Sequence, residues 1–117
     1  MTLRILVYGL LRRGGTLHGL LAGARYLEDV RVPGYDLFHM GEYPAAVPGK
    51  GAIVAELWEL ASADALSALD RAEGVPTLYR RERVLDAWLY VYARPPGGAP
   101  RIASGDWLSP PRPPSSP

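Results

Sequence analysis

The chain has 117 residues, 48% of them hydrophobic, with a formal net charge of +1 from 13 basic and 12 acidic side chains. This length suits a single domain with one core, and the nearly balanced charge gives no reason to expect nucleic acid or a membrane as a partner. The chain has no cysteine, which excludes disulfides and thiolate metal sites and suits a reducing cytoplasm.

The first quarter of the chain predicts two strands separated by a short helix. Apolar and β-branched residues over 3–8 predict a buried strand, followed by a loop that contains Gly9. Leucines at helical spacing over 16–23 predict a short helix, and 24–32 is expected to form the second strand. The two histidines, His18 and His39, lie far apart, so we expect ordinary surface or core roles and no metal site.

The middle of the chain combines turn signals with alternating apolar residues. Pro33-Gly34 predicts a turn that ends the second strand, and 35–40 is expected to form a short third strand. The Gly- and Pro-rich stretch 41–51 predicts a loop. The regular alternation over 52–60 then predicts a long strand.

The clearest predicted helix spans 62–73. Ser62 is suited to the N-cap, Asp64 lies in the first turn, where negative charge is favourable, and Gly74 follows the end. These signals agree with one another, so the bounds of this helix are well defined.

The last part of the domain predicts a hairpin and an extended piece. Residues 78–86 and 87–93 are expected to pair as strands with their turn at Asp86-Ala87. A loop over 94–100 and a short extended stretch over 101–108 follow, which makes 1–108 the domain. The proline- and serine-rich tail 109–117 is expected to be disordered; it is either a plain terminus or a ligand for a proline-binding module.

These elements together predict the α+β class. Strands outnumber helices, and the short connections between the later strands favour antiparallel pairing. We therefore expect a small mixed, strongly curved β-sheet or barrel flanked by two main helices.

One carboxylate is out of place on the predicted helix. At about 100° per residue, Glu73 falls within roughly 10° of the centre of the apolar face that Leu66 and Leu69 define. An unpaired buried carboxylate costs several kcal/mol, so Glu73 pairs, protonates or borders a polar cavity. Either the helix frays and Glu73 reaches solvent or an arginine, or it is a partly desolvated general base with a raised pKa.

Two further features lie at predicted strand ends. Gly9 can adopt backbone angles closed to other residues, so the loop after the first strand is either a simple turn or a nest of N–H groups that binds an anion or a carbonyl oxygen. Its glycines fit neither glycine-rich nucleotide-binding pattern. Tyr79 opens a strand six residues after Glu73 and is, on its own, an ordinary half-buried tyrosine.

Four stretches in this order resemble the gamma-glutamylcyclotransferase-like family, which includes the AIG2-like proteins. They are VYGLLRRGG (7–15), PGYDLFHMGEYPAAVPG (33–49), VAELWEL (54–60) and LDRAEGVPTLYRRERV (69–84). The resemblance covers residues 3–108 and implies a small mixed barrel with flanking helices. It also implies conversion of a gamma-glutamyl amine or amino acid into 5-oxoproline and a free amine, without metal or cofactor.

The resemblance assigns a role to each matching residue. Glu73 corresponds to the catalytic glutamate, and Tyr79 to a tyrosine that borders the cavity. Residues Tyr8, Gly9, Leu10 and Leu11 correspond to the loop whose backbone binds the gamma-glutamyl group. The family commonly has Ser or Thr at position 10, so Leu10 is a departure that bears on substrate identity.

Two other functions remain open at this point. A protein of the same fold could bind a small metabolite without turnover and still keep the cavity and Glu73. A purely structural or interaction domain would have no reason to direct Glu73 at an apolar face. The sequence gives no indication of oligomeric state.

Overall fold

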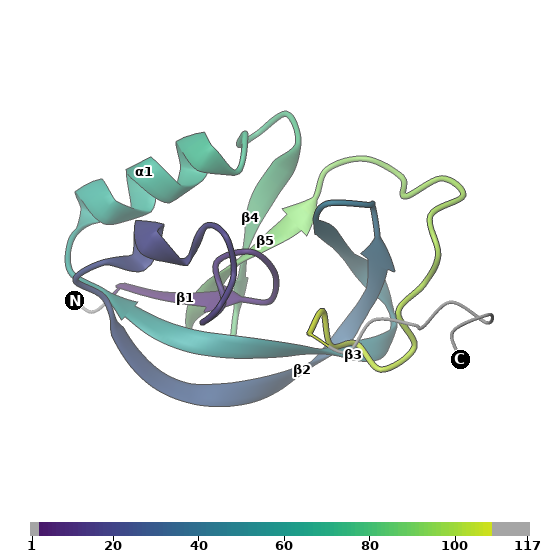
Figure 1. Cartoon of the computed structure of the whole chain (residues 1–117), viewed down its shortest axis with the longest axis horizontal. Coiled ribbons are helices and arrows are strands. Elements are labelled where there is room, and N and C mark those ends of the chain that lie inside the picture. The colour runs from purple at the N-terminus through teal and green to yellow at the C-terminus, as the bar shows by residue number, and fades with distance from the viewer. Residues whose placement is uncertain (1–2, 109–117) are drawn as a thin grey trace.

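A computed structural model of the chain describes residues 3–108, which form a five-stranded mixed sheet with strand order β2-β3-β1-β5-β4 (Figure 1). The elements are β1 (Leu3–Val7), η1 (His18–Leu21), β2 (Arg25–His39), β3 (Pro44–Leu60), α1 (Ala63–Ala72), β4 (Tyr79–Val84) and β5 (Ala87–Tyr92). β1 runs parallel to β5, and the other neighbouring pairs are antiparallel. The predicted α+β class is confirmed.

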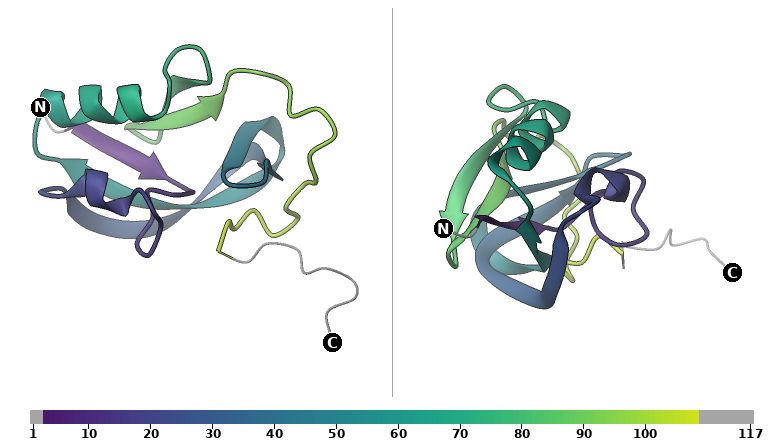
Figure 2. Two further views of the ribbon diagram at one scale, coloured as in Figure 1. Left: turned by 45° about the horizontal axis from the view of Figure 1, so that its top comes forward. Right: turned by 90° about the vertical axis from the view of Figure 1, so that its left-hand side faces the viewer.

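The sheet is strongly curved but open, so the barrel alternative is wrong. Its order begins at β2 and ends at β4, and the long β2–β3 hairpin bends along its length (Figure 2). The expectation of two main helices is also wrong within residues 3–108. Only α1 is an α-helix, and the predicted helix over 16–23 is reduced to the four-residue 3₁₀ helix η1.

Glycine explains why the second helix is so short. Gly19 lies inside η1, and Gly23, two residues after η1 ends, adopts a left-handed φ of +86°. Glycine disfavours helix propagation, and one turn does not offset the cost of helix nucleation. Neither η1 nor α1 has the length and apolar character needed to cross a membrane, and residues 3–108 contain no other helix.

The hairpin of β2 and β3 corrects two sequence expectations. The predicted turn at Pro33-Gly34 is a register shift inside β2, which continues to His39. β2 is an edge strand, where the missing N–H of a proline is tolerated and a bulge absorbs the extra residue. The predicted loop over 41–51 is mostly the first half of β3. β1 pairs only with residues 56–60 of β3. The prolines in the first half of β3 therefore lie along an edge that β1 does not reach.

Buried side chains fill both faces of the sheet. One face packs against α1 and η1 and includes Ile5, Val7, Trp58, Leu66, Leu69, Tyr79 and Tyr90. The other face includes Leu6, Tyr8, Val32, Leu37, Ile53, Leu89 and Ile102. Because successive side chains of a strand point to opposite faces of the sheet, β1 contributes side chains to both groups.

The β4–β5 hairpin turns one residue earlier than predicted. Val84 pairs with Ala87, so the two turn residues are Leu85 and Asp86, with φ of 52° and 59°. Positive φ at both central residues matches the right-handed twist of a two-residue hairpin. Ala87 belongs to β5, and the predicted turn at Asp86-Ala87 is therefore wrong by one position.

The segment after β5 returns to the far end of the β2–β3 hairpin. Ile102 N donates to Leu37 O at 2.7 Å, and Val54 N donates to Gly105 O at 2.8 Å. Arg101 forms an isolated bridge with Phe38, but 102–108 contains no strand and is mostly turns and a bend, so the extended stretch predicted there is wrong. The tail 109–117 lies outside the described residues.

Candidate active site

A cavity of about 40 Å³ lies where β1 ends, next to the start of β3 and the last turn of α1. It is lined by Leu6, Val7, Tyr8, Gly9, Leu10, Leu11, Tyr43, Pro44, Glu73, Tyr79 and Tyr90. All six residues that the sequence selected are among them. These six residues come from three separate parts of the chain, 8–11, Glu73 and Tyr79, so the fold brings them together.

Glu73 is held at the C-cap of α1. Its N–H donates to Leu69 O at 2.9 Å, and Gly74 follows with a left-handed φ of +68°. At the other end, the side chain of Ser62 accepts from Ala65 N, as the capping pattern predicted. The helix is intact at Glu73, so the alternative of a frayed end does not describe this structure.

The Glu73 carboxylate is largely buried and uncompensated. Burial raises its pKa from the usual 4.5 to about 7. Within residues 3–108 it has no hydrogen-bond or ion-pair partner, and the nearby Arg81 instead contacts Asp70 at 3.2 Å. A carboxylate with such a pKa can accept a proton near neutral pH and return it.

Three tyrosines of the cavity use their hydroxyl protons within the protein. Tyr8 Oη donates to Tyr90 O at 2.6 Å, Tyr79 Oη donates to Pro44 O at 2.6 Å, and Tyr90 Oη donates to Asp70 Oδ1 at 2.8 Å. Burial raises the pKa of all three, so they remain protonated. Tyr8 Oη already accepts from Ala46 N at 3.3 Å, so the hydroxyl oxygens of Tyr79 and Tyr90 are the ones that can act as acceptors towards a ligand.

The turn after β1 presents hydrogen-bond donors, whereas the hydroxyls of Tyr79 and Tyr90 act as acceptors. The carbonyls of Gly9, Leu10 and Leu11 all accept hydrogen bonds, from Arg12 N, Leu17 N and His18 Nδ1 respectively. The amides of the same three residues donate to no acceptor within residues 3–108. Three successive amides without partners form a set of donors next to the cavity.

Glycine is required at position 9 for a reason that the sequence did not reveal. Its φ is not in the left-handed region, so the expectation of a special backbone angle is wrong. Instead, a Cβ on Gly9 would lie 2.6 Å from Pro44 Cγ and 2.8 Å from Pro44 Cδ. The first residue of β3 therefore approaches the turn too closely for any side chain.

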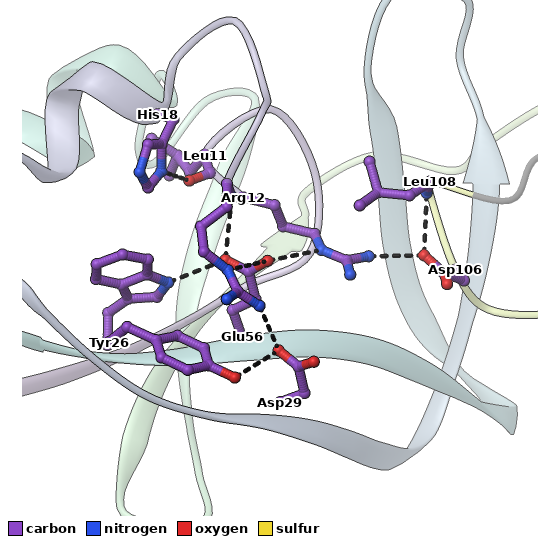
Figure 3. Close-up of polar contacts among 10 residues, drawn as sticks. Leu11, Arg12, His18, Tyr26, Asp29, Glu56, Asp106 and Leu108 are labelled. Atoms are coloured by element: carbon purple, nitrogen blue, oxygen red, sulfur yellow. Dashed lines mark hydrogen bonds and ion pairs between the residues drawn. The ribbon is translucent and has the colours of Figure 1, made fainter.

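A buried ion pair lies beneath this turn (Figure 3). Glu56 of β3 accepts from Arg12 Nε at 3.4 Å and from Arg13 N and Trp58 Nε1, both at 3.1 Å. The other end of the Arg12 guanidinium contacts Asp106 Oδ1 at 2.7 Å. The turn is thereby attached to β3 and to the C-terminal segment.

His18 and His39 both have roles within the fold. His18 Nδ1 donates to Leu11 O at 2.9 Å, and its ring meets that of Trp58 edge-on. His39 Nδ1 accepts from Gly41 N at 3.1 Å. No group of three or more His, Cys, Asp or Glu side chains suited to a metal ion occurs in the part of the chain that the structure describes.

Comparison with known proteins identifies the family. The family model described as "Gamma-glutamyl cyclotransferase, AIG2-like" matches residues 5–109, nearly the whole chain. The chain belongs to the gamma-glutamylcyclotransferase family. The predicted resemblance is thus confirmed.

Relatives of this AIG2-like protein match it along most of their own length. The gamma-glutamylcyclotransferase family protein YtfP of Escherichia coli K12 is 39% identical, covering 91% of this chain and 96% of YtfP. Its solution structure superposes with a TM-score of 0.73. A crystal structure from Pyrococcus horikoshii, 36% identical and covering 90% of this chain and 89% of its own, gives a TM-score of 0.80.

Sequence reasoning missed several residues that line the cavity or support the turn beside it. Tyr43 and Pro44 lie in the stretch 41–51, for which the sequence predicts a loop, and Tyr90 lies in a uniformly apolar strand. The Arg12–Glu56 pair had one visible signal, because Glu56 is an acidic residue on an otherwise apolar face of its strand. Only the pairing of β1 with β3 reveals that Glu56 lies opposite Val7, just before the turn.

Proposed function

We propose that this protein is an enzyme that cyclises a gamma-glutamyl amine or gamma-glutamyl amino acid to 5-oxoproline and releases the free amine. The carrying observation is the Glu73 carboxylate, whose pKa burial raises to about 7, in the same cavity as the three unpaired amides of Gly9–Leu11. Membership of the gamma-glutamylcyclotransferase family supports the same reaction.

The proposed reaction is an intramolecular acyl transfer. The substrate's α-ammonium gives a proton to Glu73, and the resulting amine attacks the γ-carbonyl carbon, which forms the C–N bond of a five-membered ring. The tetrahedral intermediate then collapses, the bond to the leaving nitrogen breaks, and Glu73 returns the proton to that nitrogen. The ring nitrogen gives its second proton, by way of Glu73, to the released amine, which leaves as an ammonium ion. No water is consumed and no redox step occurs, so the reaction balances without a cofactor.

The two polarities of the cavity give the substrate an orientation. In the proposal, the Tyr79 and Tyr90 hydroxyl oxygens and the Glu73 carboxylate accept from the α-amino group, because all three are acceptors. The amides of Gly9, Leu10 and Leu11 donate to the γ-carbonyl oxygen as it becomes an oxyanion. Holding both ends of a flexible chain in this way favours ring closure.

The binding-protein alternative predicts a different outcome in one experiment. Wild-type protein is incubated with a panel of gamma-glutamyl amines and amino acids, and 5-oxoproline release is measured, with Glu73→Gln as the matched control. The enzyme proposal expects release by the wild type and none above background by the variant. Calorimetric binding of a gamma-glutamyl compound without release by the wild type would instead support the metabolite-binding alternative.

Two expectations from the sequence belong to the same proposal. The domain is taken as residues 1–108, and the reaction is taken to occur in the cytoplasm, because the absence of cysteine suits a reducing compartment. Removing 109–117 is expected to leave 5-oxoproline release unchanged.

A further inference from the structure

The ion network beneath the turn, formed by Arg12, Glu56 and Asp106, has a buried charge pair at its centre. Glu56 is 1% exposed and Arg12 is 6% exposed, so both charges are almost completely removed from water. Replacing such a pair with well-packed apolar residues is often neutral or stabilising, because desolvation offsets the attraction. A buried pair at this place is therefore better explained by positioning than by stability.

Each charged side chain of the network is held by several hydrogen bonds or ion pairs. Both oxygens of Glu56 take two donors: Oε1 accepts from Arg13 N and Trp58 Nε1, and Oε2 lies 3.4 Å from Arg12 Nε and 3.3 Å from Arg13 Nε. Asp106 Oδ1 takes Arg12 Nη1 and also Leu108 N at 3.0 Å. The Arg12 side chain therefore spans two anchored carboxylates (Figure 3).

The network is connected directly to the candidate oxyanion donors. Arg12 N donates to Gly9 O at 3.0 Å, which closes the turn that contains the Gly9, Leu10 and Leu11 amides. Displacing the backbone of Arg12 would therefore rotate the peptide groups on which those amides lie. None of the three charged side chains lines the cavity, so any influence on the reaction passes through the turn.

We propose that Glu56, Arg12 and Asp106 are positioning residues that hold the amides of Gly9–Leu11 in line with the developing oxyanion. This inference rests on the proposed function, and it gives the C-terminal segment a role in a reaction that takes place at the end of β1. Asp106 anchors the outer end of the Arg12 guanidinium, and Glu56 anchors the inner end.

Asp106→Ala is the most informative variant, because Asp106 lies at the partly exposed end of the network and its loss is expected to leave the chain folded. We expect kcat to fall by about 10- to 100-fold, as for a small misplacement of catalytic groups. KM is expected to change by less than about threefold, because the oxyanion contact exists only in the transition state. Asp106→Asn keeps an oxygen acceptor for Arg12 and is expected to restore part of the rate.

Arg101→Met is the matched control. It removes an exposed ion pair, between Arg101 Nη2 and Asp36 Oδ1 at 3.4 Å, from the same C-terminal segment, and it is expected to keep the wild-type kcat. Arg12→Lys keeps the positive charge but cannot span both carboxylates, and it is expected to resemble Asp106→Ala. If Asp106→Ala and Arg12→Lys lower the melting temperature but keep the wild-type kcat per folded molecule, the role is only structural and the proposal is wrong.

An NMR measurement tests the same relation without turnover. In ¹⁵N relaxation, the order parameters of the Gly9, Leu10 and Leu11 amides are expected to be about 0.85 in the wild type and to fall towards about 0.6 in Asp106→Ala. They should be unchanged in Arg101→Met. If the wild type releases no 5-oxoproline, the proposed function fails, yet this measurement still decides whether Asp106 holds the turn. Unchanged order parameters in Asp106→Ala would overturn the positioning role.

Discussion

The two walls of the cavity contribute in different ways. The end of α1 contributes one side chain, Glu73, whose pKa is about 7 because it is buried. The turn after β1 contributes backbone: its carbonyls are occupied, its amides are not, and Gly9 is present because Pro44 leaves no room for a Cβ. Any substitution of Glu73 removes its carboxylate, whereas every substitution in the turn other than proline keeps the backbone amide and can only displace it.

This difference also explains what each wall shows in a sequence. A side chain proposed to act in catalysis can break the pattern around it, as Glu73 breaks the apolar face of Leu66 and Leu69. A backbone group that acts in a site shows in the sequence only as a small residue nearby. Glycine occurs for many unrelated reasons, so this signal is weak. Changes at the side-chain wall should therefore act on the chemical step, and changes at the backbone wall should act through geometry.

Glu73→Gln is expected to have the largest effect. Loss of a general base costs about 10²–10⁴-fold in rate, while the amide keeps the shape of the side chain. The melting temperature is expected to rise, because a desolvated charge is removed. The comparison is kcat and thermal unfolding against Glu59→Gln, which changes a partly exposed carboxylate in the Arg25 ion pair. Full turnover by Glu73→Gln would show that the base is another group.

Gly9→Ala is expected to have the next largest effect. The added Cβ would clash with Pro44, and a displaced oxyanion donor typically costs about 10²–10³-fold in kcat. Gly19→Ala is the matched control, because a Cβ at Gly19 meets nothing within 4 Å.

A double variant sharpens this test of the backbone wall. Pro44→Ala removes the ring carbons that the new Cβ would meet, yet it keeps the carbonyl that accepts from Tyr79 Oη. Gly9→Ala combined with Pro44→Ala is expected to recover part of the kcat, measured per folded molecule by circular dichroism and 5-oxoproline release. If Gly9→Ala loses activity only in proportion to its loss of stability, the turn is structural.

The local parts of this fold were predictable from local signals. The helix over 62–73 has its cap at Ser62, its buried leucines and its terminal Gly74, and the structure has α1 within one residue of those bounds. Glu73 could be selected because a helix has a fixed angular repeat. These features depend on residues that are close in sequence, where spacing alone determines the geometry.

The parts that depend on distant contacts were not predictable. Pro33-Gly34 is a strong turn signal, and only the edge position of β2 lets the strand continue through it. The close contact between Gly9 and Pro44 and the pairing of Arg12 with Glu56 join residues more than 30 positions apart. No local pattern encodes such pairs, so the cause of the glycine and the support of the turn became visible only in three dimensions.

The pH dependence tests the side-chain wall with no substitution at all. Because the Glu73 carboxylate must be ionised to accept a proton, kcat/KM is expected to rise about tenfold per pH unit below a pKa of about 7 and to level off above it. The folded pKa is raised above the unfolded value of 4.5, so the stability from this group is fully present below about pH 4.5. It is lost as the pH rises towards 7.

The difference in melting temperature between Glu73→Gln and the wild type isolates this effect from the other titrating groups. That difference is expected to grow between pH 4.5 and 7, where Glu73 becomes charged in the wild type only. A ¹³C titration of the Glu73 carboxyl gives its pKa directly. Ionisation near or below 4.5 would contradict both the activity profile and the stability profile.

Leu10→Ser is expected to have the smallest effect and is the most direct comparison of side chain with backbone within the turn. Leu10 lines the cavity, but its carbonyl accepts from Leu17 N, and its amide is one of the proposed donors, so both backbone groups survive the substitution. The kcat for a good substrate is therefore expected to stay within about threefold of the wild type. KM for apolar leaving groups is expected to rise by roughly tenfold, because an apolar contact is lost from the wall. Kinetics with two gamma-glutamyl substrates that differ only in the leaving amine separate these quantities. If kcat for both substrates falls as far as in Gly9→Ala, the side chain at position 10 takes part in the chemical step and the backbone account of the turn is wrong.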